Sequence, residues 1–275
     1  MKYSLEIYFF ASAIVLLIGW YSFKRKSVSV SGLAALVIIS NIIIWLDEMA
    51  LLLTLFYMFA SSSALSGIQK KQKHETESVI SKSGPRDYIQ ALANLGVATV
   101  CIVAFRFFQD PVLIVAAIGS VAAGNADSWA SEIGSFSKQD PVSITTFKPL
   151  PKGISGGVTI LGTLAGFAGS LFVVLASVFT IQLLDKVTVA IFPVVISTCI
   201  AGFSGMLFDS YIGALFQALY KNKETSGVTE IPEENLLLKG YRWMNNDMVN
   251  FLSTLFGGIM AGMIYLTISY LVKAI

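Results

Sequence analysis

Long apolar segments alternate with short polar ones along the whole chain. About 20 consecutive apolar residues are enough for a helix to cross the roughly 30 Å hydrocarbon core of a bilayer. Helices and closed barrels are the two structures that satisfy their own backbone there. The pattern therefore predicts an all-α, polytopic integral membrane protein with about eight transmembrane helices. They lie at about 4–23, 28–46, 49–69, 86–108, 111–134, 156–184, 188–220 and 247–272.

The composition agrees with this class. Of the 275 residues, 55% are hydrophobic and only 13% are charged, and the mean hydropathy is +0.72. Soluble domains carry about 25% charged residues. We expect a single membrane domain over 1–275, with a peripheral first helix at 1–27 and a solvated polar loop at 221–246 on the cytoplasmic side.

The basic residues predict the orientation of the helices. Lysine and arginine cluster at 24–26, 70–86, 138–152 and 221–242, which are alternate connections between the apolar segments. Cytoplasmic loops carry an excess of these residues, so both termini are expected outside. The first segment has no signal-peptide pattern, and no Arg/Ser-rich transit peptide precedes it. We therefore expect the cell membrane of a prokaryote, with the active site facing the cytoplasm.

The segment 188–220 is too long for a simple crossing, because a helix of that length would reach about 50 Å. Counting inward from Thr188, the lipid span ends near Phe208. Asp209 is then expected at the inner interface, with the rest of the helix projecting into the cytosol. An acid at that depth needs a partner, which suggests a metal ion or an arginine.

A polar stripe opens the segment 86–108. Arg86, Gln90 and Asn94 follow one another at intervals of four residues, so they lie on one helix face. Polar residues in membrane helices often join neighbouring helices. Three in register, one of them an arginine, favour a binding site for an anionic substrate group instead.

The end of segment 111–134 carries two acids. Asn125, Ser128 and Glu132 share one helix face, whereas Asp127 lies roughly 140° from Glu132. Asp127 is the better metal candidate, and Glu132 is expected to bind a second cation or to orient a substrate group. A solvated helix end is the alternative, although acids at a helix C-terminus are electrostatically unfavourable without a cation.

The loop that follows leads into a glycine-rich turn. Three prolines make the loop extended, and it carries Lys148 and Lys152 to Ser155, Gly156 and Gly157 at the start of segment 156–184. Free amides at a helix N-terminus bind anions, so we expect phosphate binding there, with close helix packing as the alternative. No Walker A pattern occurs in the chain.

The last apolar segment also begins with polar residues. Asn246, Asp247 and Asn250 lie in its first turns, where they are expected either to cap the helix or to bind a ligand. With these residues, the ionisable side chains gather at the cytoplasmic ends of five helices. A conducting path would spread such residues across the membrane, so a single site facing the cytosol is favoured.

At these positions the sequence resembles the integral-membrane family of phytyl-phosphate kinase and transmembrane protein nineteen. The resemblance covers roughly 28–272 and is most specific in the Asp127–Glu132 block and in the glycine-rich turn. Ser128 stands where the family most often has threonine. The motifs are Gly84-Pro85-Arg86 with Gln90 and Asn94, 126–134, 141–146, 152–157, Asp209-Ser210 with Gly213 and Gln217, and Asn246-Asp247 with Asn250.

The resemblance implies a kinase that converts a polyprenyl or phytyl-type monophosphate to the diphosphate, with CTP or another nucleoside triphosphate as donor. It implies Mg²⁺, or Mn²⁺, as the metal. The expected partners are the bilayer, an isoprenoid monophosphate and a nucleotide, with no nucleic acid; a homo-oligomer is left open. The expected catalytic residues are Asp127, Glu132, Lys152 and Asp209, with the metal on Asp127, Glu132 and Asp209.

Substrate contacts are expected from residues in or beside several of these motifs, with Arg86 on the acceptor phosphate. The full set is Arg86, Gln90, Asn94, Asn125, Lys148, Ser155, Gly156, Gly157, Asn246, Asp247 and Asn250. Two other functions remain open. A cytidylyltransferase that makes a CDP-lipid would use similar residues. A transporter or flippase of phosphorylated lipids should carry polar residues beyond the membrane midplane, and the first, second and sixth segments have almost none.

Overall fold

Eight helices make up most of the part of the chain that the computed structural model describes, residues 3–69, 84–184, 190–223, 227–233 and 235–274. Seven of these helices are long and apolar enough to cross a membrane, and α2 is a shorter apolar helix. The predicted helical membrane class is confirmed. The helices are α1 Leu5–Lys24, α2 Val30–Trp45, α3 Met49–Gln69, α4 Tyr88–Phe108, α5 Pro111–Gly134, α6 Ile160–Leu184, α7 Ile191–Phe216 and α8 Asn246–Ala274.

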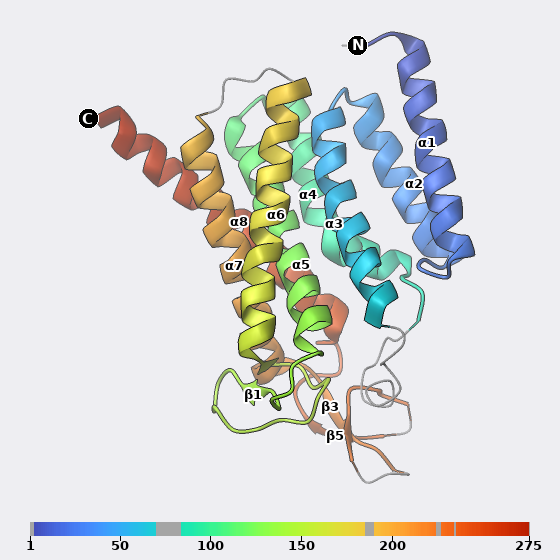
Figure 1. Cartoon of the computed structure of the whole chain (residues 1–275), viewed down its shortest axis with the longest axis vertical. Coiled ribbons are helices and arrows are strands. Elements are labelled where there is room, and N and C mark those ends of the chain that lie inside the picture. Colours follow the sequence, from blue (N-terminus) through green and yellow to red (C-terminus); the bar gives the residue numbers. More distant parts are fainter. Residues whose placement is uncertain (1–2, 70–83, 185–189, 224–226, 234, 275) are drawn as a thin grey trace.

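The helices alternate in direction, and both termini lie at the same end of the bundle (Figure 1). The connections that carry the β-strands lie at the other end, which we call the strand-bearing end. Helix α5 is central and packs against α3, α4, α6, α7 and α8, whereas α1 packs chiefly against α2 at the edge. Part of the basic connection 70–86 and the expected start of the seventh helix at 188 fall outside the described residues.

Small residues allow α5 to pack closely against α7 and α8. A Cβ atom added to Gly119 would lie 2.3 Å from the Cβ of Ala261 on α8. On the other side, a Cβ atom added to Gly205 of α7 would lie 2.5 Å from the Cβ of Ala123. Membrane helices associate through such small residues, because van der Waals packing replaces the hydrophobic effect in lipid. The candidate site residues of α5 are thereby fixed against both neighbours.

The prediction that the seventh helix continues to 220 is wrong. Helix α7 ends at Phe216, because Gln217 has extended backbone angles and its backbone forms a bridge to Tyr241. The chain then forms a three-stranded antiparallel sheet in the order β4-β3-β5. Its strands are β3 Leu219–Lys221, β4 Val228–Thr229 and β5 Leu236–Lys239. The 221–246 loop is therefore partly folded rather than simply solvated, and Thr229 and Glu230 are buried.

The prediction that the sixth helix begins at 156 is also wrong. Strand β1, Val142–Ser143, pairs with β2, Gly157–Val158, so the glycine-rich turn belongs to a small hairpin. Helix α6 begins only at Ile160, and the Oγ1 atom of Thr159 accepts a hydrogen bond from the Gly162 amide at 3.0 Å. The first turn of α6 is thus capped by its own side chain, and its dipole does not start at the glycine-rich turn.

Candidate functional site

The glycine-rich turn packs closely against the end of α7. Gly156 has φ of +84°, and a Cβ atom there would lie 2.4 Å from the Cβ of Ala214. Glycine alone combines this left-handed backbone with such a close approach. The neighbouring Ser155 amide donates a hydrogen bond of 2.8 Å to Oε1 of Glu230. The turn therefore presents an amide to an anionic group, although from a hairpin and not from a helix N-terminus.

Asp127 and Asp209 come together from α5 and α7. The negative charges of their two carboxylates interact, and the charge of Glu230 also interacts with that of Asp209. The two aspartates lie close together because Ala123 of α5 is in close contact with Gly205 of α7. Each aspartate follows one of these two residues by four positions, which is about one helical turn. Helices α5 and α7 run in the same direction, so the two carboxylates reach the same level (Figure 1). We call them the acid pair.

The acid pair has the donor set that Mg²⁺ commonly takes in proteins. The Oδ2 atom of Asp209 is buried and has no hydrogen-bond partner among the described residues. No group of three or more His, Cys, Asp or Glu suited to a metal ion occurs in the described part of the chain. Mg²⁺ usually binds through one or two carboxylates together with substrate phosphates, so a pair is sufficient.

Glu132 does not join the acid pair. It faces α3, where its Oε1 atom accepts a hydrogen bond from the Ser66 hydroxyl, and its charge interacts with Arg86. The expected three-residue metal set of Asp127, Glu132 and Asp209 is therefore divided between two places. The separation follows from the angle of roughly 140° between Asp127 and Glu132 on the helix. Glu132 therefore interacts with Arg86, a cation of the chain itself, and not with the acid pair.

Arg86 lies among hydroxyl groups of α3. Its Nη1 atom donates to the hydroxyls of Ser62 and Ser63 at 3.2 Å each, and Nη2 donates to Ser66 at 3.5 Å. Burial lowers the pKa of the Arg86 guanidinium, and the charge of Glu132 raises it. Arginine side chains stay protonated in proteins, so the group keeps its positive charge. Arg86 is thus a half-buried, oriented cation.

The backbone of Arg86 is held as firmly as its side chain. Its amide donates to the carbonyl of Ser27 at 3.1 Å, and its carbonyl accepts from the Ser29 amide at 2.9 Å. A Cβ atom on Gly32 would lie 2.1 Å from the Arg86 carbonyl oxygen. The start of α2 therefore fixes where the guanidinium lies, with glycine needed at position 32 for the close approach.

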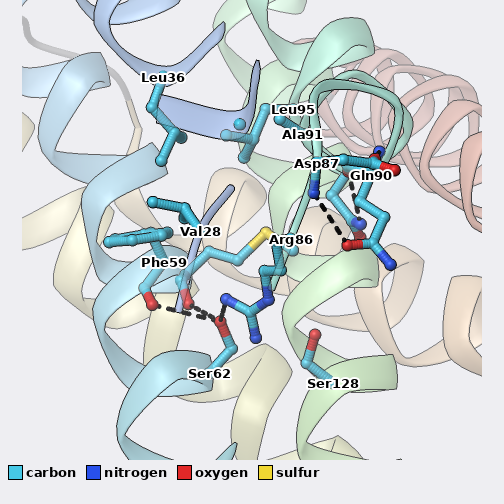
Figure 2. Close-up of a pocket in the computed structure, with 13 residues that line it drawn as sticks. Val28, Leu36, Phe59, Ser62, Arg86, Asp87, Gln90, Ala91, Leu95 and Ser128 are labelled. Carbon is cyan, nitrogen blue, oxygen red and sulfur yellow. Dashed lines mark hydrogen bonds between the residues drawn. The ribbon is translucent and has the colours of Figure 1, made fainter. Parts of the chain in front are cut away.

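Arg86 lies in a cleft between α2, α3, α4 and α5 (Figure 2). The space measures about 460 Å³, including the part that is open to the surroundings. One part of the lining is polar, with hydroxyl, amide and guanidinium groups, and the rest is apolar. The polar lining consists of Ser62, Arg86, Asp87, Gln90, Asn94 and Ser128, and the apolar lining includes Val28, Leu36, Met58, Phe59 and Leu95.

Gln90 and Asn94 line this cleft as the polar stripe predicted, but both also serve the helix. Gln90 forms a capping box with Asp87, in which the Asp87 amide donates to the Gln90 side-chain oxygen and the Gln90 amide donates to Asp87. The Asn94 side chain donates to the Gln90 carbonyl at 3.0 Å. The Asp-x-x-Gln spacing signals such a box in the sequence, and the prediction overlooked it.

Asn125 serves helix packing rather than the cleft. Its side chain is fully buried, donates to the Gly169 carbonyl of α6 at 2.8 Å and accepts from the Ser61 hydroxyl of α3 at 2.8 Å. These contacts join three helices through one amide, a common use of asparagine in membrane bundles. We therefore remove Asn125 from the expected substrate contacts.

Lys148 and Lys152 lie on the exposed surface of the hairpin connection. The Lys152 ammonium donates to the Ser137 carbonyl at 3.3 Å, a contact within its own loop. Both side chains are at the strand-bearing end, on the same connection as the glycine-rich turn. Their expected contacts with a nucleotide stay predictions.

Of the polar residues at the start of α8, one caps the helix and the others are buried or half-buried. The side-chain oxygen of Asn245 accepts from the Met248 amide at 3.0 Å, so Asn245 supplies the cap. Asn246 and Asn250 are half-buried, and Asp247 is buried. Their expected substrate contacts stay predictions, and their level at the strand-bearing end is that of the other site residues.

Two further residues, Glu230 and Gln217, lie at the site. The sequence predicted a solvated loop around Glu230 and marked Gln217 only as part of a family motif, without a role. Burial raises the pKa of Glu230, and hydrogen bonds from Ser155 and Gln217 lower it. Both residues are more than nine-tenths buried. Glu230 lies among alternating charges that are typical of solvated loops, so no local signal marked it. The serine run at 61–63 on an apolar segment was a detectable signal for the Arg86 cleft.

Comparison with known proteins places these features in a family context. The family described as "Integral membrane protein DUF92" matches residues 13–258. Protein PGR of Arabidopsis thaliana is 33% identical over 267 residues, which is 90% of this chain and 92% of that protein. Protein VTE6, chloroplastic, of the same plant is 28% identical over 214 residues, covering 75% of this chain and 55% of VTE6.

An uncharacterized membrane protein of Methanocaldococcus jannaschii is 29% identical over 218 residues, or 79% of this chain and 76% of that protein. No solved structure matches the chain. The family match and the two plant relatives confirm the family resemblance that the sequence motifs indicated. These relatives come from a plant and an archaeon.

Proposed function

The chain belongs to the DUF92 family of integral membrane proteins, and from this premise we propose that it is a nucleoside-triphosphate-dependent kinase. Its acceptor is an isoprenoid monophosphate, which becomes the diphosphate. The reaction takes place at the strand-bearing end, on the cytoplasmic face of the membrane. The observation that carries this proposal is the cleft in which a half-buried arginine lies in a polar lining beside an apolar one (Figure 2).

The acceptor half of the site is the Arg86 cleft. An isoprenoid monophosphate combines a compact anionic headgroup with a branched apolar tail. A guanidinium binds a phosphate through two parallel hydrogen bonds, and Arg86 is already oriented by three serines and Glu132. The apolar lining at Val28, Leu36 and Leu95 offers a path for the first isoprene units. Arg86 therefore binds the headgroup while the tail extends toward lipid.

The donor half of the site is the acid pair with the glycine-rich turn. The Ser155 amide hydrogen-bonds to a carboxylate oxygen, and a phosphate oxygen is an acceptor of the same kind. Asp127 and Asp209 would hold Mg²⁺, or Mn²⁺, which when bound neutralises negative charge on the donor phosphates. CTP is the donor that the family resemblance favours, with other nucleoside triphosphates as alternatives.

The two halves meet on α5. Ser128 lines the Arg86 cleft, and the adjacent Asp127 belongs to the acid pair. Consecutive helical residues lie about 100° apart around the axis, so the acceptor side and the donor side are different faces of α5 at nearly the same level. The acceptor is itself an anion, so the chain needs no strong base. Its contribution is positioning, together with electrostatic stabilisation of the transferring group.

The test is a product analysis. The protein, purified in lipid nanodiscs with Mg²⁺, is incubated with a panel of nucleoside triphosphates and prenyl monophosphates, and products are identified by mass. A kinase yields nucleoside diphosphate and prenyl diphosphate in equal amounts. Release of pyrophosphate with a nucleotidyl-lipid would establish a cytidylyltransferase instead. Absence of nucleotide consumption, with movement of phosphorylated lipid across the bilayer, would establish a transporter.

A further inference from the structure

Glu230 is a buried acid in a connection that the sequence marks as solvated. Only 7% of its surface is exposed, and the preceding Thr229 is fully buried at the end of β4. The Thr229 hydroxyl accepts a hydrogen bond from the Ile231 amide at 3.2 Å, which bends the chain after Glu230. The small sheet thus directs this one side chain of the connection toward the helices.

The Glu230 carboxylate contacts the glycine-rich turn and lies near Asp209 of the acid pair. Its Oε1 atom accepts from the Ser155 amide at 2.8 Å, and the Gln217 side chain supplies another hydrogen bond. Its charge also repels that of Asp209. A third carboxylate beside two others is electrostatically unfavourable, and these hydrogen bonds offset part of that cost.

We propose that the Glu230 carboxylate is a built-in occupant of the anion site on the Ser155 amide, and that a donor polyphosphate binds by displacing it. The inference rests on the proposed function, because it concerns the donor half of the same site. Carboxylate and phosphate oxygens are acceptors of the same kind, and an amide N–H donates one well-aligned hydrogen bond. Both anions cannot hold the Ser155 amide together.

Displacement has a definite electrostatic consequence. While Glu230 occupies the turn, its charge opposes an incoming polyphosphate and favours cations near Asp209. Once it leaves, the amide of Ser155 and the backbone of Gly156 are open to the phosphate. Glu230 therefore lowers the affinity of the turn for free polyphosphate. If Glu230 merely supported the turn, its loss would weaken binding, so the sign of the effect separates the two roles.

The experiment measures binding of inorganic tripolyphosphate to the full-length protein in nanodiscs at saturating Mg²⁺, by calorimetry. Glu230→Gln keeps the shape of the side chain and removes its charge, so the competing hydrogen bond becomes a neutral one. We expect the dissociation constant to fall about fivefold, the usual difference between charged and neutral acceptors. Glu233→Gln, an exposed residue on the same connection, is the matched control and should change nothing.

An unchanged or higher dissociation constant for Glu230→Gln overturns the proposal. Should that variant fail to fold, Glu230→Asp replaces it. The shorter side chain reaches the Ser155 amide less well, so it must also tighten binding. Absence of tripolyphosphate binding in every folded variant removes both this proposal and the donor half of the proposed function. Tighter binding in Glu230→Gln, with no prenyl diphosphate made by the wild-type protein, upholds this proposal and removes the kinase.

Discussion

The Arg86 cleft and the acid pair lie on two sides of α5, and they hold buried charge in opposite ways. Arg86 is surrounded by three serine hydroxyls and by the charge of Glu132, so its charge is balanced within the chain. Asp127 and Asp209 instead bring like charges together, with Glu230 close by. The protein alone balances the charge of the first region, whereas we propose that a divalent cation balances the charge of the second.

This difference indicates what each region binds. A balanced arginine with a polar and an apolar lining can accept an anionic headgroup without reorganising the protein. A group of carboxylates can accept a triphosphate only together with a divalent cation. The comparison therefore predicts that substitutions on the two sides of α5 affect different substrates.

Asp127→Asn should give the largest loss. Removing one charge from the acid pair removes the cation and its stabilisation of the transition state, which is worth several kcal/mol. We expect turnover to fall at least about a thousandfold while the protein still folds. Asp140→Asn, an exposed aspartate in the connection after α5, is the control. Wild-type turnover of Asp127→Asn at limiting Mg²⁺ would show that Asp127 is not a ligand.

Arg86→Ala should raise KM for the prenyl monophosphate about ten- to hundredfold, because a charge-assisted phosphate contact is worth about 1.5–3 kcal/mol. The KM for the nucleotide should not change. Arg106→Ala, at the opposite end of α4, is the control. If Arg86→Ala unfolds the protein, the charge-neutral pair Arg86→Ala with Glu132→Gln replaces it. A nucleotide KM that rises as much as the lipid KM would contradict the separation.

Glu132→Gln should have a smaller effect on the same side. The substitution removes a charge that interacts with Arg86 but keeps an acceptor for the Ser66 hydroxyl, a difference of about 1 kcal/mol. We expect a rise in KM for the lipid of roughly fivefold, with an unchanged Mg²⁺ requirement. A raised Mg²⁺ requirement would instead return Glu132 to the metal-binding residues that the sequence predicted.

Lys152→Ala should have the smallest effect. The side chain is exposed and donates to a carbonyl of its own loop, so its attraction for a nucleotide is screened by solvent. We expect KM for the nucleotide to rise less than about fivefold, the equivalent of about 1 kcal/mol. The effect should shrink further at high salt. A loss as large as that of Asp127→Asn would show that the hairpin closes on the nucleotide.

The sequence alone was enough to predict the membrane class, the approximate positions of the helices, and Arg86, Gln90 and Asn94 of the Arg86 cleft. Each of these features is set within a single segment of the chain. They are the length of the apolar segments, the four-residue spacing of Arg86, Gln90 and Asn94, and the angle between Asp127 and Glu132 on one helix. Helical geometry fixes such relations whatever the rest of the chain does. The overlooked capping box at Asp87 was equally local and could have been found.

Which acids lie close together depends on how the helices pack. Asp127 and Asp209 are neighbours because Ala123 and Gly205 let two distant helices touch, and that contact has no local pattern. The same holds for Glu230, which a small sheet turns inward onto Ser155, and for Asn125, whose partners lie on two other helices. Side-chain burial and pairing across elements depend on packing in three dimensions, and residue spacing along the chain does not encode them.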